Sequence, residues 1–300
     1  MVTADKLGGV HVALATPVGP DGDLDTGGLD RLLSRVIDGG VSAICPTGST
    51  GEGPRLSRGQ RVEITRQLRK RVGAERLVMA GASALNVADA VEEISELADA
   101  GADAVLLAPP SYYPLRADGV VGWYRAVGSA ATLPIVLYNI PSMTKIMLPP
   151  EAVAELAAQP GIIGIKDSSR DFEYLESIVY ATSGAEDFAV LTGSDTMLLA
   201  SLTVGAVGTI AASANLVPAL GREVYDAAAQ GGDHDRARKV QERLYQVGMA
   251  CRVGPPPSGW KAALAWAGVC APDLVPPAAG LTAAEREVLG ARLTELGVAR

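Results

Sequence analysis

The chain has 300 residues, of which 48% are hydrophobic and 20% are charged, and this composition excludes a disordered protein. A formal net charge of −8 disfavours general binding to nucleic acid, because an acidic surface repels phosphate. Three widely spaced cysteines and two histidines offer no disulfide framework, zinc site or histidine-based triad. No apolar run approaches the ~20 residues that span a bilayer, and residues 1–7 lack a signal-peptide core, so we expect a cytoplasmic protein.

Short apolar runs recur along the chain, and each is followed by a segment with helical spacing. Runs such as residues 104–108 and 135–137 do not alternate with polar residues, which is typical of parallel strands covered on both faces. Most runs begin about 30 residues apart, the length of a βαβ unit, whereas the last interval leaves room for a helix of about two turns. The runs begin near Val10, Ala43, Leu77, Ala104, Pro134, Ile162, Phe188 and Ala206.

Helix start signals agree with these intervals. Ser57 and Gln60 have the spacing of a capping box and predict a helix that begins near residue 58. Thr282 and Glu285 predict another helix that begins near residue 283.

Eight strand–helix units predict a (β/α)8 barrel, which we assign to residues 1–232 as the catalytic domain. Residues 233–300 are predicted to form further helices packed on the barrel. The proline-rich segments 254–257 and 276–277 mark breaks between these helices. An open doubly wound sheet is the alternative fold, and the absence of a G-x-G-x-x-G motif after the first strand disfavours it.

In such a barrel, the chemistry lies at the carboxyl ends of the strands. Lys166 ends an apolar strand, where loss of hydration disfavours the ammonium and favours a nucleophilic amine. The alternative is a structural ion pair with Asp167 or Glu52. Tyr138 ends the preceding strand, where its hydroxyl could carry protons or simply contact water at the rim.

The loop at residues 48–51 follows the second strand and contains two glycines and two hydroxyl side chains. Glycines let backbone N–H groups approach an anion closely, so this loop is a candidate carboxylate-binding site, although an ordinary βα turn has the same composition. His11 and Cys45 lie in strands and are expected to be core residues. His234 is expected to be exposed on a late helix.

Three motifs occur in order, each at the end of a predicted strand: Gly48-Ser49-Thr50-Gly51-Glu52, Tyr138-Asn139-Ile140-Pro141 and Gly164-Ile165-Lys166-Asp167-Ser168. Together with residues 191–195 and 208–210, they resemble the dihydrodipicolinate synthase / N-acetylneuraminate lyase superfamily over nearly the whole chain. The resemblance implies a class I lyase that forms a Schiff base with a 2-oxo acid such as pyruvate. It also implies a homotetramer and chemistry that needs no metal or organic cofactor.

The resemblance assigns roles to individual side chains. Lys166 would form the imine and Tyr138 would relay protons. Ser49 and Thr50 would hold the carboxylate of the 2-oxo acid, and Thr50 would also bond the Tyr138 hydroxyl. Tyr112 would reach the site of a neighbouring subunit. The expected substrate contacts also include Gly48, Gly193, Ile210 and Met143.

The chain departs from typical dihydrodipicolinate synthases beyond the tyrosine motif. Met143 stands where they usually have an arginine that holds the carboxylate of the second substrate, and Lys145 stands where they usually have glycine. The missing arginine argues against aspartate semialdehyde as the second substrate. Ser49, which stands where those synthases commonly have a threonine, also argues against it. Lys145 or Arg170 could replace the missing arginine, or both could be solvated surface charges.

We therefore expect an aldolase that cleaves or forms a 2-oxo-3-deoxy sugar acid and releases or consumes pyruvate. The first alternative is a 4-hydroxy-tetrahydrodipicolinate synthase, which condenses pyruvate with aspartate semialdehyde. A dehydratase or hydratase-aldolase that uses the same imine is the second alternative. A non-catalytic protein that binds a 2-oxo acid is the third.

Overall fold

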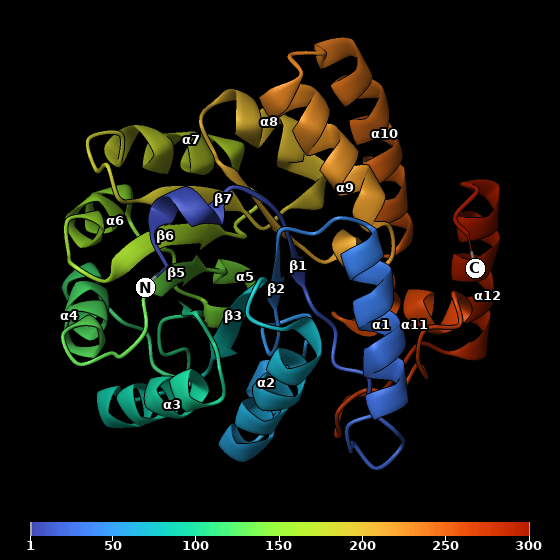
Figure 1. The fold of residues 1–300 in the computed structure, drawn as a ribbon, viewed down its shortest axis with the longest axis horizontal. Coiled ribbons are helices and arrows are strands. Elements are labelled where there is room, and N and C mark those ends of the chain that lie inside the picture. The colour runs from blue at the N-terminus through green and yellow to red at the C-terminus, as the bar shows by residue number, and fades with distance from the viewer. Residues whose placement is uncertain (1, 300) are drawn as a thin grey trace.

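Eight parallel strands close into a barrel in the order in which they occur in the sequence (Figure 1). The computed structural model describes residues 2–299. Each predicted apolar run forms one strand and begins within two residues of the predicted position, which confirms the (β/α)8 fold. The strands are β1 (Gly9–Ala13), β2 (Ala43–Cys45), β3 (Leu77–Ala82), β4 (Ala104–Leu107), β5 (Ile135–Asn139), β6 (Ile162–Asp167), β7 (Ala189–Thr192) and β8 (Gly208–Ala211).

Helices follow the strands and cover the outside of the barrel (Figure 1). Short 3₁₀ turns occur at η1 (Ala4–Leu7), η2 (Gly53–Arg55), η3 (Asp195–Met197) and η4 (Ser213–Asn215), and η5 (Asp226–Gln230) is a π-helical turn. The capping boxes predicted at Ser57 and Thr282 are both present. The short α5 (Pro141–Thr144) lies inside the ring of outer helices in Figure 1. The outer helices are α1 (Thr26–Asp38), α2 (Arg58–Val72), α3 (Val87–Asp99), α4 (Ala117–Gly128), α6 (Pro150–Ala157), α7 (Phe172–Ala181), α8 (Leu198–Thr203) and α9 (Pro218–Tyr225).

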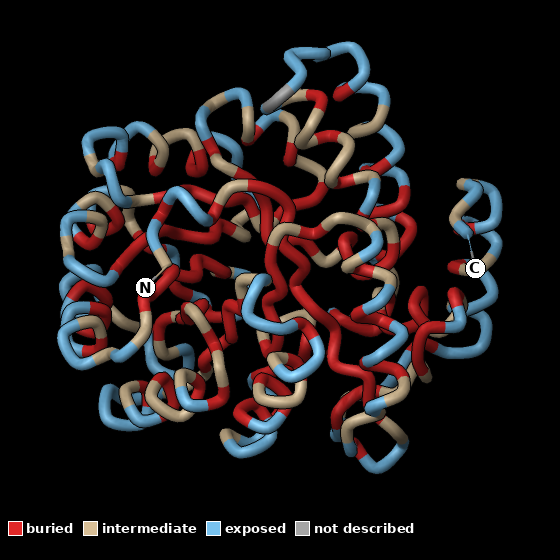
Figure 2. Tube along the Cα trace, in the orientation of Figure 1, coloured by how far each residue is buried: buried red, intermediate tan, exposed pale blue. Residues whose placement is uncertain are grey.

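Side chains of the strands alternate between the barrel interior and the layer under the helices, except where β6 has an extra residue. In β5, Val136 and Tyr138 belong to the interior cluster, whereas Ile135 and Leu137 pack with the helices. Figure 2 shows the consequence, because buried residues follow the strands and exposed residues follow the outer faces of the helices. The interior is therefore filled by side chains and is not an open channel.

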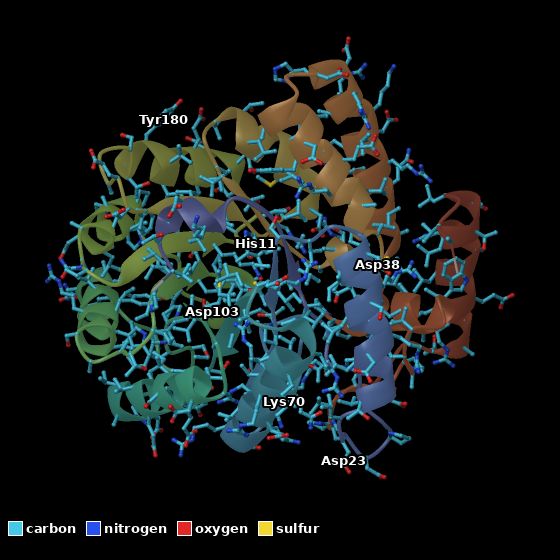
Figure 3. All side chains as sticks on the ribbon, viewed as in Figure 1. His11, Asp23, Asp38, Lys70, Asp103 and Tyr180 are labelled. Carbon is cyan, nitrogen blue, oxygen red and sulfur yellow. The ribbon has the colours of Figure 1, made fainter. Side chains whose placement is uncertain are left out.

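The amino-terminal end of the barrel is closed by η1. Leu7 is fully buried in the interior cluster, and its carbonyl oxygen lies 2.8 Å from Nε2 of His11. Burial lowers the pKa of His11 to about 4, and Figure 3 places this side chain inside the fold, whereas Lys70 and Tyr180 lie on outer helices. A small molecule must therefore enter from the carboxyl end of the strands.

The C-terminal helices share a core with the barrel. They are α10 (His234–Ala250), α11 (Ser258–Trp266) and α12 (Ala283–Glu295), and the predicted proline-rich breaks separate them. Apolar residues of all three pack with α1, β1 and β2 in one cluster. Among residues 2–299, no helix is long and apolar enough to cross a membrane.

A buried ion pair joins α11 to the loop after β2. Lys261 Nζ lies 3.3 Å from Glu52 Oε1 and donates to the carbonyl oxygens of Thr16 (2.6 Å) and Asp273 (2.7 Å). Both partners of this ion pair are almost fully buried, and removing one partner of such a pair leaves the other charge uncompensated. This contact holds the glycine-rich loop in place from the far end of the chain.

Candidate active site

A cavity of about 550 Å³ opens at the carboxyl ends of the strands, where a barrel carries its chemistry. This volume is in the range of small-molecule sites. Its wall includes most of the side chains expected from the sequence: Gly48, Ser49, Thr50, Tyr138, Met143, Lys166, Gly193 and Ile210. The sequence motifs therefore meet in one place, although they lie on five strands and their loops.

The position of Lys166 depends on an irregularity in β6. Ile135 pairs with Ile162, but the next residue, Val136, pairs with Gly164, so β6 has one extra residue. This bulge reverses the alternation of β6 and turns Lys166 to the same side as its partner Tyr138. A side chain at Gly164 would come within 2.6 Å of the Ala189 carbonyl oxygen, which explains the glycine.

Three polar side chains meet at the base of the cavity. Lys166 Nζ lies 3.3 Å from the Tyr138 hydroxyl, and that hydroxyl lies 3.2 Å from Ser49 Oγ. Lys166 and Tyr138 are only 5% and 6% exposed, so their polar atoms contact one another and the cavity rather than bulk water. The arrangement connects an amine to a phenol and a hydroxyl through which protons can move.

The expected contact between Thr50 and the Tyr138 hydroxyl is wrong. Ser49 makes this contact, and Thr50 lines the same cavity. Successive residues of a tight turn project in different directions, so only one of the two hydroxyls reaches the phenol. The motif identified the loop but did not indicate which of its hydroxyls faces β5.

The ion pair offered as an alternative role for Lys166 is also wrong. Asp167 accepts from Asn139 Nδ2 (2.7 Å) and Ser169 Oγ (2.8 Å), and Glu52 is held by Lys261. Within residues 2–299, no carboxylate lies at ion-pair distance from Lys166. Its amine is buried without a fixed counter-charge.

The loop after β2, which lines the cavity, also carries backbone N–H groups without an internal partner. The N–H groups of Ser49 and Thr50 donate to no other group in the described part of the chain. Tight packing holds the loop, because a side chain at Gly51 would lie 2.7 Å from the Leu14 carbonyl oxygen. Unpaired N–H groups on a fixed turn are suited to a carboxylate.

Glycine is required beside the lysine. A side chain at Gly193 would clash with Ser168 Oγ and approach Lys166 Cε to 2.9 Å. Ile210 is buried in the interior cluster and lines the same cavity. Cys45 lies in the same cluster, and burial raises the pKa of its thiol to about 12, so it is a core residue as expected and not a nucleophile.

Tyr112 does not line the cavity of its own chain. Its side chain is 77% exposed and packs edge-to-face against Tyr113, with ring centroids 4.9 Å apart. The resemblance assigned Tyr112 to the site of a neighbouring subunit, and this assignment stays a prediction.

Charged residues also line the cavity, and they include one of the two cations that the sequence offered in place of the missing arginine. Arg170 and Arg252 line it, whereas Lys145 does not and donates instead to the Ser142 carbonyl oxygen (2.8 Å). Asp195 also lines it, and one of its carboxylate oxygens, Oδ1, is buried without a hydrogen-bond partner. Burial raises the pKa of the Asp195 carboxyl. Arg252 follows α10 in the C-terminal region, and no sequence pattern connected it to the strand ends.

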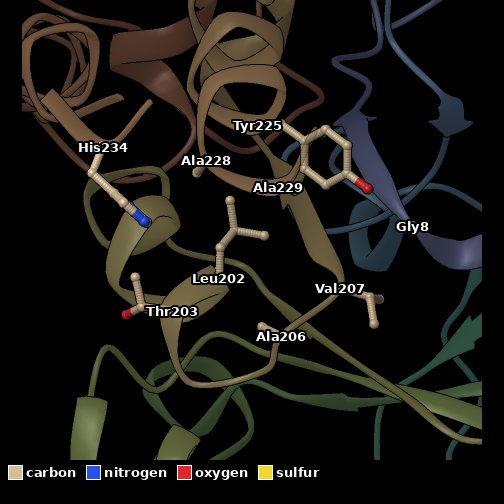
Figure 4. Close-up of a pocket in the computed structure, with 9 residues that line it drawn as sticks. All are labelled: Gly8, Leu202, Thr203, Ala206, Val207, Tyr225, Ala228, Ala229 and His234. Atoms are coloured by element: carbon tan, nitrogen blue, oxygen red, sulfur yellow. The ribbon is translucent and has the colours of Figure 1, made fainter. Parts of the chain in front are cut away.

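A second, smaller cavity of about 340 Å³ shares no residue with the first (Figure 4). It lies among α8, η5 and the start of α10 and is mostly apolar. His234 lies at its edge and is exposed, as expected. No lysine or carboxylate lines this cavity, so the strand-end cavity is the candidate active site.

Comparisons with known proteins agree with the geometry. The model of the dihydrodipicolinate synthetase family matches residues 6–296. An uncharacterized DapA-like lyase of Halobacterium salinarum is 36% identical over 99% of this chain and 97% of its own. A 4-hydroxy-tetrahydrodipicolinate synthase of Hyphomonas neptunium is 34% identical over 95% of this chain and 97% of its own.

Solved structures lead to the same family. YagE, a prophage protein of E. coli K12 whose structure was solved in complex with pyruvate, superimposes with a TM-score of 0.93 and 29% identity. The match covers 97% of this chain and 99% of YagE. The chain therefore belongs to the dihydrodipicolinate synthetase family and is a lyase of that family.

Proposed function

We propose that the protein is a class I aldolase that joins pyruvate to Lys166 as a Schiff base and makes or breaks a carbon–carbon bond to an aldehyde. The observation that carries this proposal is the buried amine of Lys166, which lacks a counter-charge and lies 3.3 Å from the Tyr138 hydroxyl. A desolvated amine of this kind is suited to attack on a carbonyl carbon.

The chemistry follows from these side chains. Lys166 Nζ adds to the ketone carbon of pyruvate, and loss of water leaves an iminium ion. The iminium accepts electrons when a proton leaves the methyl carbon, which gives an enamine. The enamine carbon then attacks the aldehyde carbon and forms the new bond, and water releases the product from Lys166. Cleavage runs through the same steps in reverse.

Each proton in this sequence has a carrier within reach. The Tyr138 hydroxyl contacts both Lys166 Nζ and Ser49 Oγ, so it can pass a proton between the reacting centre and the loop. The free N–H groups of Ser49 and Thr50 are suited to hold the pyruvate carboxylate beside the lysine. A non-catalytic binding protein would not need this relay.

Reduction with borohydride tests the proposal directly. The protein is incubated with pyruvate and reduced, and its peptides are mapped by mass spectrometry. We expect a stable adduct on Lys166 that requires both pyruvate and borohydride. Absence of an adduct, with the protein folded and pyruvate saturating, would overturn the Schiff-base mechanism.

The partner aldehyde is expected to carry hydroxyl groups, as in a 2-oxo-3-deoxy sugar acid. Met143 supplies no charge where the resemblance would place an arginine, and it is 49% exposed at the cavity wall. Asp195 instead offers a buried carboxylate oxygen without a partner, which could accept a hydrogen bond from a substrate hydroxyl. The alternative remains 4-hydroxy-tetrahydrodipicolinate synthase, the name of several relatives such as that of Hyphomonas neptunium.

A comparison of aldehydes separates these two functions. With pyruvate saturating, kcat/KM for glyceraldehyde is expected to exceed that for aspartate semialdehyde. Loss of one charge-assisted hydrogen bond costs about 1.5–3 kcal/mol, which is about ten- to a hundredfold in kcat/KM. A clear preference for aspartate semialdehyde would favour the synthase.

We further propose that the protein is a homotetramer. Tyr112 and Tyr113 are both exposed on one loop, and tyrosine is enriched in the cores of protein interfaces. Closed symmetric assemblies are the usual form of homo-oligomers. Light scattering at micromolar concentration is expected to give the mass of four chains, and Tyr112→Ser with Tyr113→Ser is expected to weaken the assembly. A monomer in the unmodified protein would contradict the proposal.

A further inference from the structure

Arg170 adopts a backbone conformation that arginine rarely takes. It lies between the end of β6 and the start of α7, and its φ is 64°. This left-handed region favours glycine, and other residues that adopt it cluster at functional sites. Arg170 lines the strand-end cavity, and within residues 2–299 its guanidinium has no ion-pair or hydrogen-bond partner.

A second arginine reaches the same cavity from the C-terminal region. Arg252 Nη2 donates to Thr196 Oγ1 (3.3 Å), and the side chain has no carboxylate partner within ion-pair distance in the described residues. Arg252 is exposed, but partial desolvation lowers its pKa, and the positive charge of Arg170 lowers that pKa further. Both guanidinium groups line one cavity, where their like charges repel one another.

Another arginine of the cavity wall already has a carboxylate partner. Arg55 Nη1 pairs with Glu52 Oε2 at 3.1 Å. The negative charge of Asp195 raises the pKa of Arg252, and the positive charges of Arg252 and Lys166 lower the pKa of Asp195. Lys166, Asp195 and both arginines line the same cavity. Lys166 is buried and the two arginines are exposed, so the cavity has a buried reacting end at Lys166 and a cationic end that is open to solvent.

We propose that Arg170 and Arg252 form a subsite for an anionic group on the aldehyde substrate, at the end remote from the reacting carbon. This inference rests on the proposed aldolase function and specifies its substrate class: a hydroxylated aldehyde that ends in a carboxylate or phosphate. An anion between the two guanidinium groups removes their repulsion, and the planar fork of arginine matches both groups. Two arginines from other elements thus supply the positive charge that is missing at Met143.

The same pair disfavours aspartate semialdehyde. That molecule carries an ammonium beside its carboxylate, and two guanidinium groups would repel the ammonium. A hydroxy acid of similar size has no such charge, so the subsite selects it.

The test uses the full chain and aldehydes that differ in charge. With pyruvate saturating, kcat/KM is measured for glyceraldehyde, glyceraldehyde 3-phosphate and 2-hydroxy-3-oxopropanoate, which are neutral, phosphorylated and carboxylated. The unmodified enzyme is expected to prefer one of the anionic aldehydes by tenfold or more, and the better of the two identifies the group. Arg170→Gly and Arg252→Gln are expected to reduce that preference by about ten- to a hundredfold each.

Lys145→Gly is the matched control. Lys145 also has a positive φ, 61°, and a charged side chain, but it does not line the cavity. Its replacement removes one positive charge from a residue with a similar φ and should leave the preference for anionic aldehydes unchanged. An equal loss in Lys145→Gly and Arg170→Gly would assign the effect to net charge and overturn the subsite.

Two further measurements separate failure of the subsite from failure of the mechanism. Borohydride trapping of pyruvate reports on Lys166 alone, and calorimetric titration with inorganic phosphate and with tartronate reports on the arginine pair without turnover. Anion binding that is lost in Arg170→Gly supports the subsite even if trapping fails. Normal trapping with an unaltered aldehyde preference and no anion binding in any variant would overturn the subsite and leave the aldolase mechanism standing.

Discussion

Replacement of Lys166 with alanine is expected to abolish both borohydride-trapped pyruvate and aldol activity. Among the described residues that line the cavity, Lys166 is the only lysine, so the loss should reach the detection limit. Lys166→Arg is expected to fail equally, because guanidinium stays protonated and cannot attack a carbonyl. The measurement is adduct yield by mass spectrometry, together with the rate of pyruvate release or consumption.

Lys261 provides an internal control for this experiment. It is as deeply buried as Lys166, but its amine is bound by Glu52 and two carbonyl oxygens. Burial alone would label both lysines, whereas the proposed mechanism labels only the one whose amine is free beside Tyr138. Adduct on Lys261 or on a surface lysine, or full activity in Lys166→Ala with the thermal unfolding temperature unchanged, would contradict the assignment.

The barrel could be predicted because its signals are local. Each strand is a continuous apolar run, each interval has the length of one crossover, and capping residues such as Ser57 fix where helices begin. These patterns depend on a few neighbouring residues, so they can be identified without knowledge of the tertiary structure. The rule that chemistry lies at the carboxyl ends of strands then predicts that Lys166 and Tyr138 share one site.

The details of the site depend on contacts that no local pattern encodes. The bulge at Gly164 decides which side of β6 presents Lys166, and it is visible only in the pairing with β5. Glu52 finds its partner, Lys261, on a helix near the far end of the chain. Arg252 likewise reaches the cavity from beyond α10. Such long-range contacts arise from packing of the C-terminal helices, which the sequence predicted only as helices on the barrel.

Removal of the Tyr138 hydroxyl is expected to slow turnover strongly while imine formation partly survives. Tyr138→Phe keeps the ring, which belongs to the interior cluster and lies 4.3 Å from Lys166 Nζ at its centroid. Loss of a positioned acid–base group costs about 10²–10⁴ in rate. Single-turnover kinetics should show a large fall in kcat, whereas trapping with borohydride should still label Lys166.

The partner of Tyr138 can be identified by comparing the two loop hydroxyls. Ser49→Ala is expected to lower kcat more than Thr50→Ala does, because only Ser49 Oγ lies within 3.2 Å of the phenol. Combining Ser49→Ala with Tyr138→Phe should add little to the loss from Tyr138→Phe alone, since both changes interrupt one relay. Fully additive losses would show that the two hydroxyls act separately. A wild-type rate in Tyr138→Phe would show that Tyr138 contributes only to packing. The proton would then have to reach the enamine through water in the cavity.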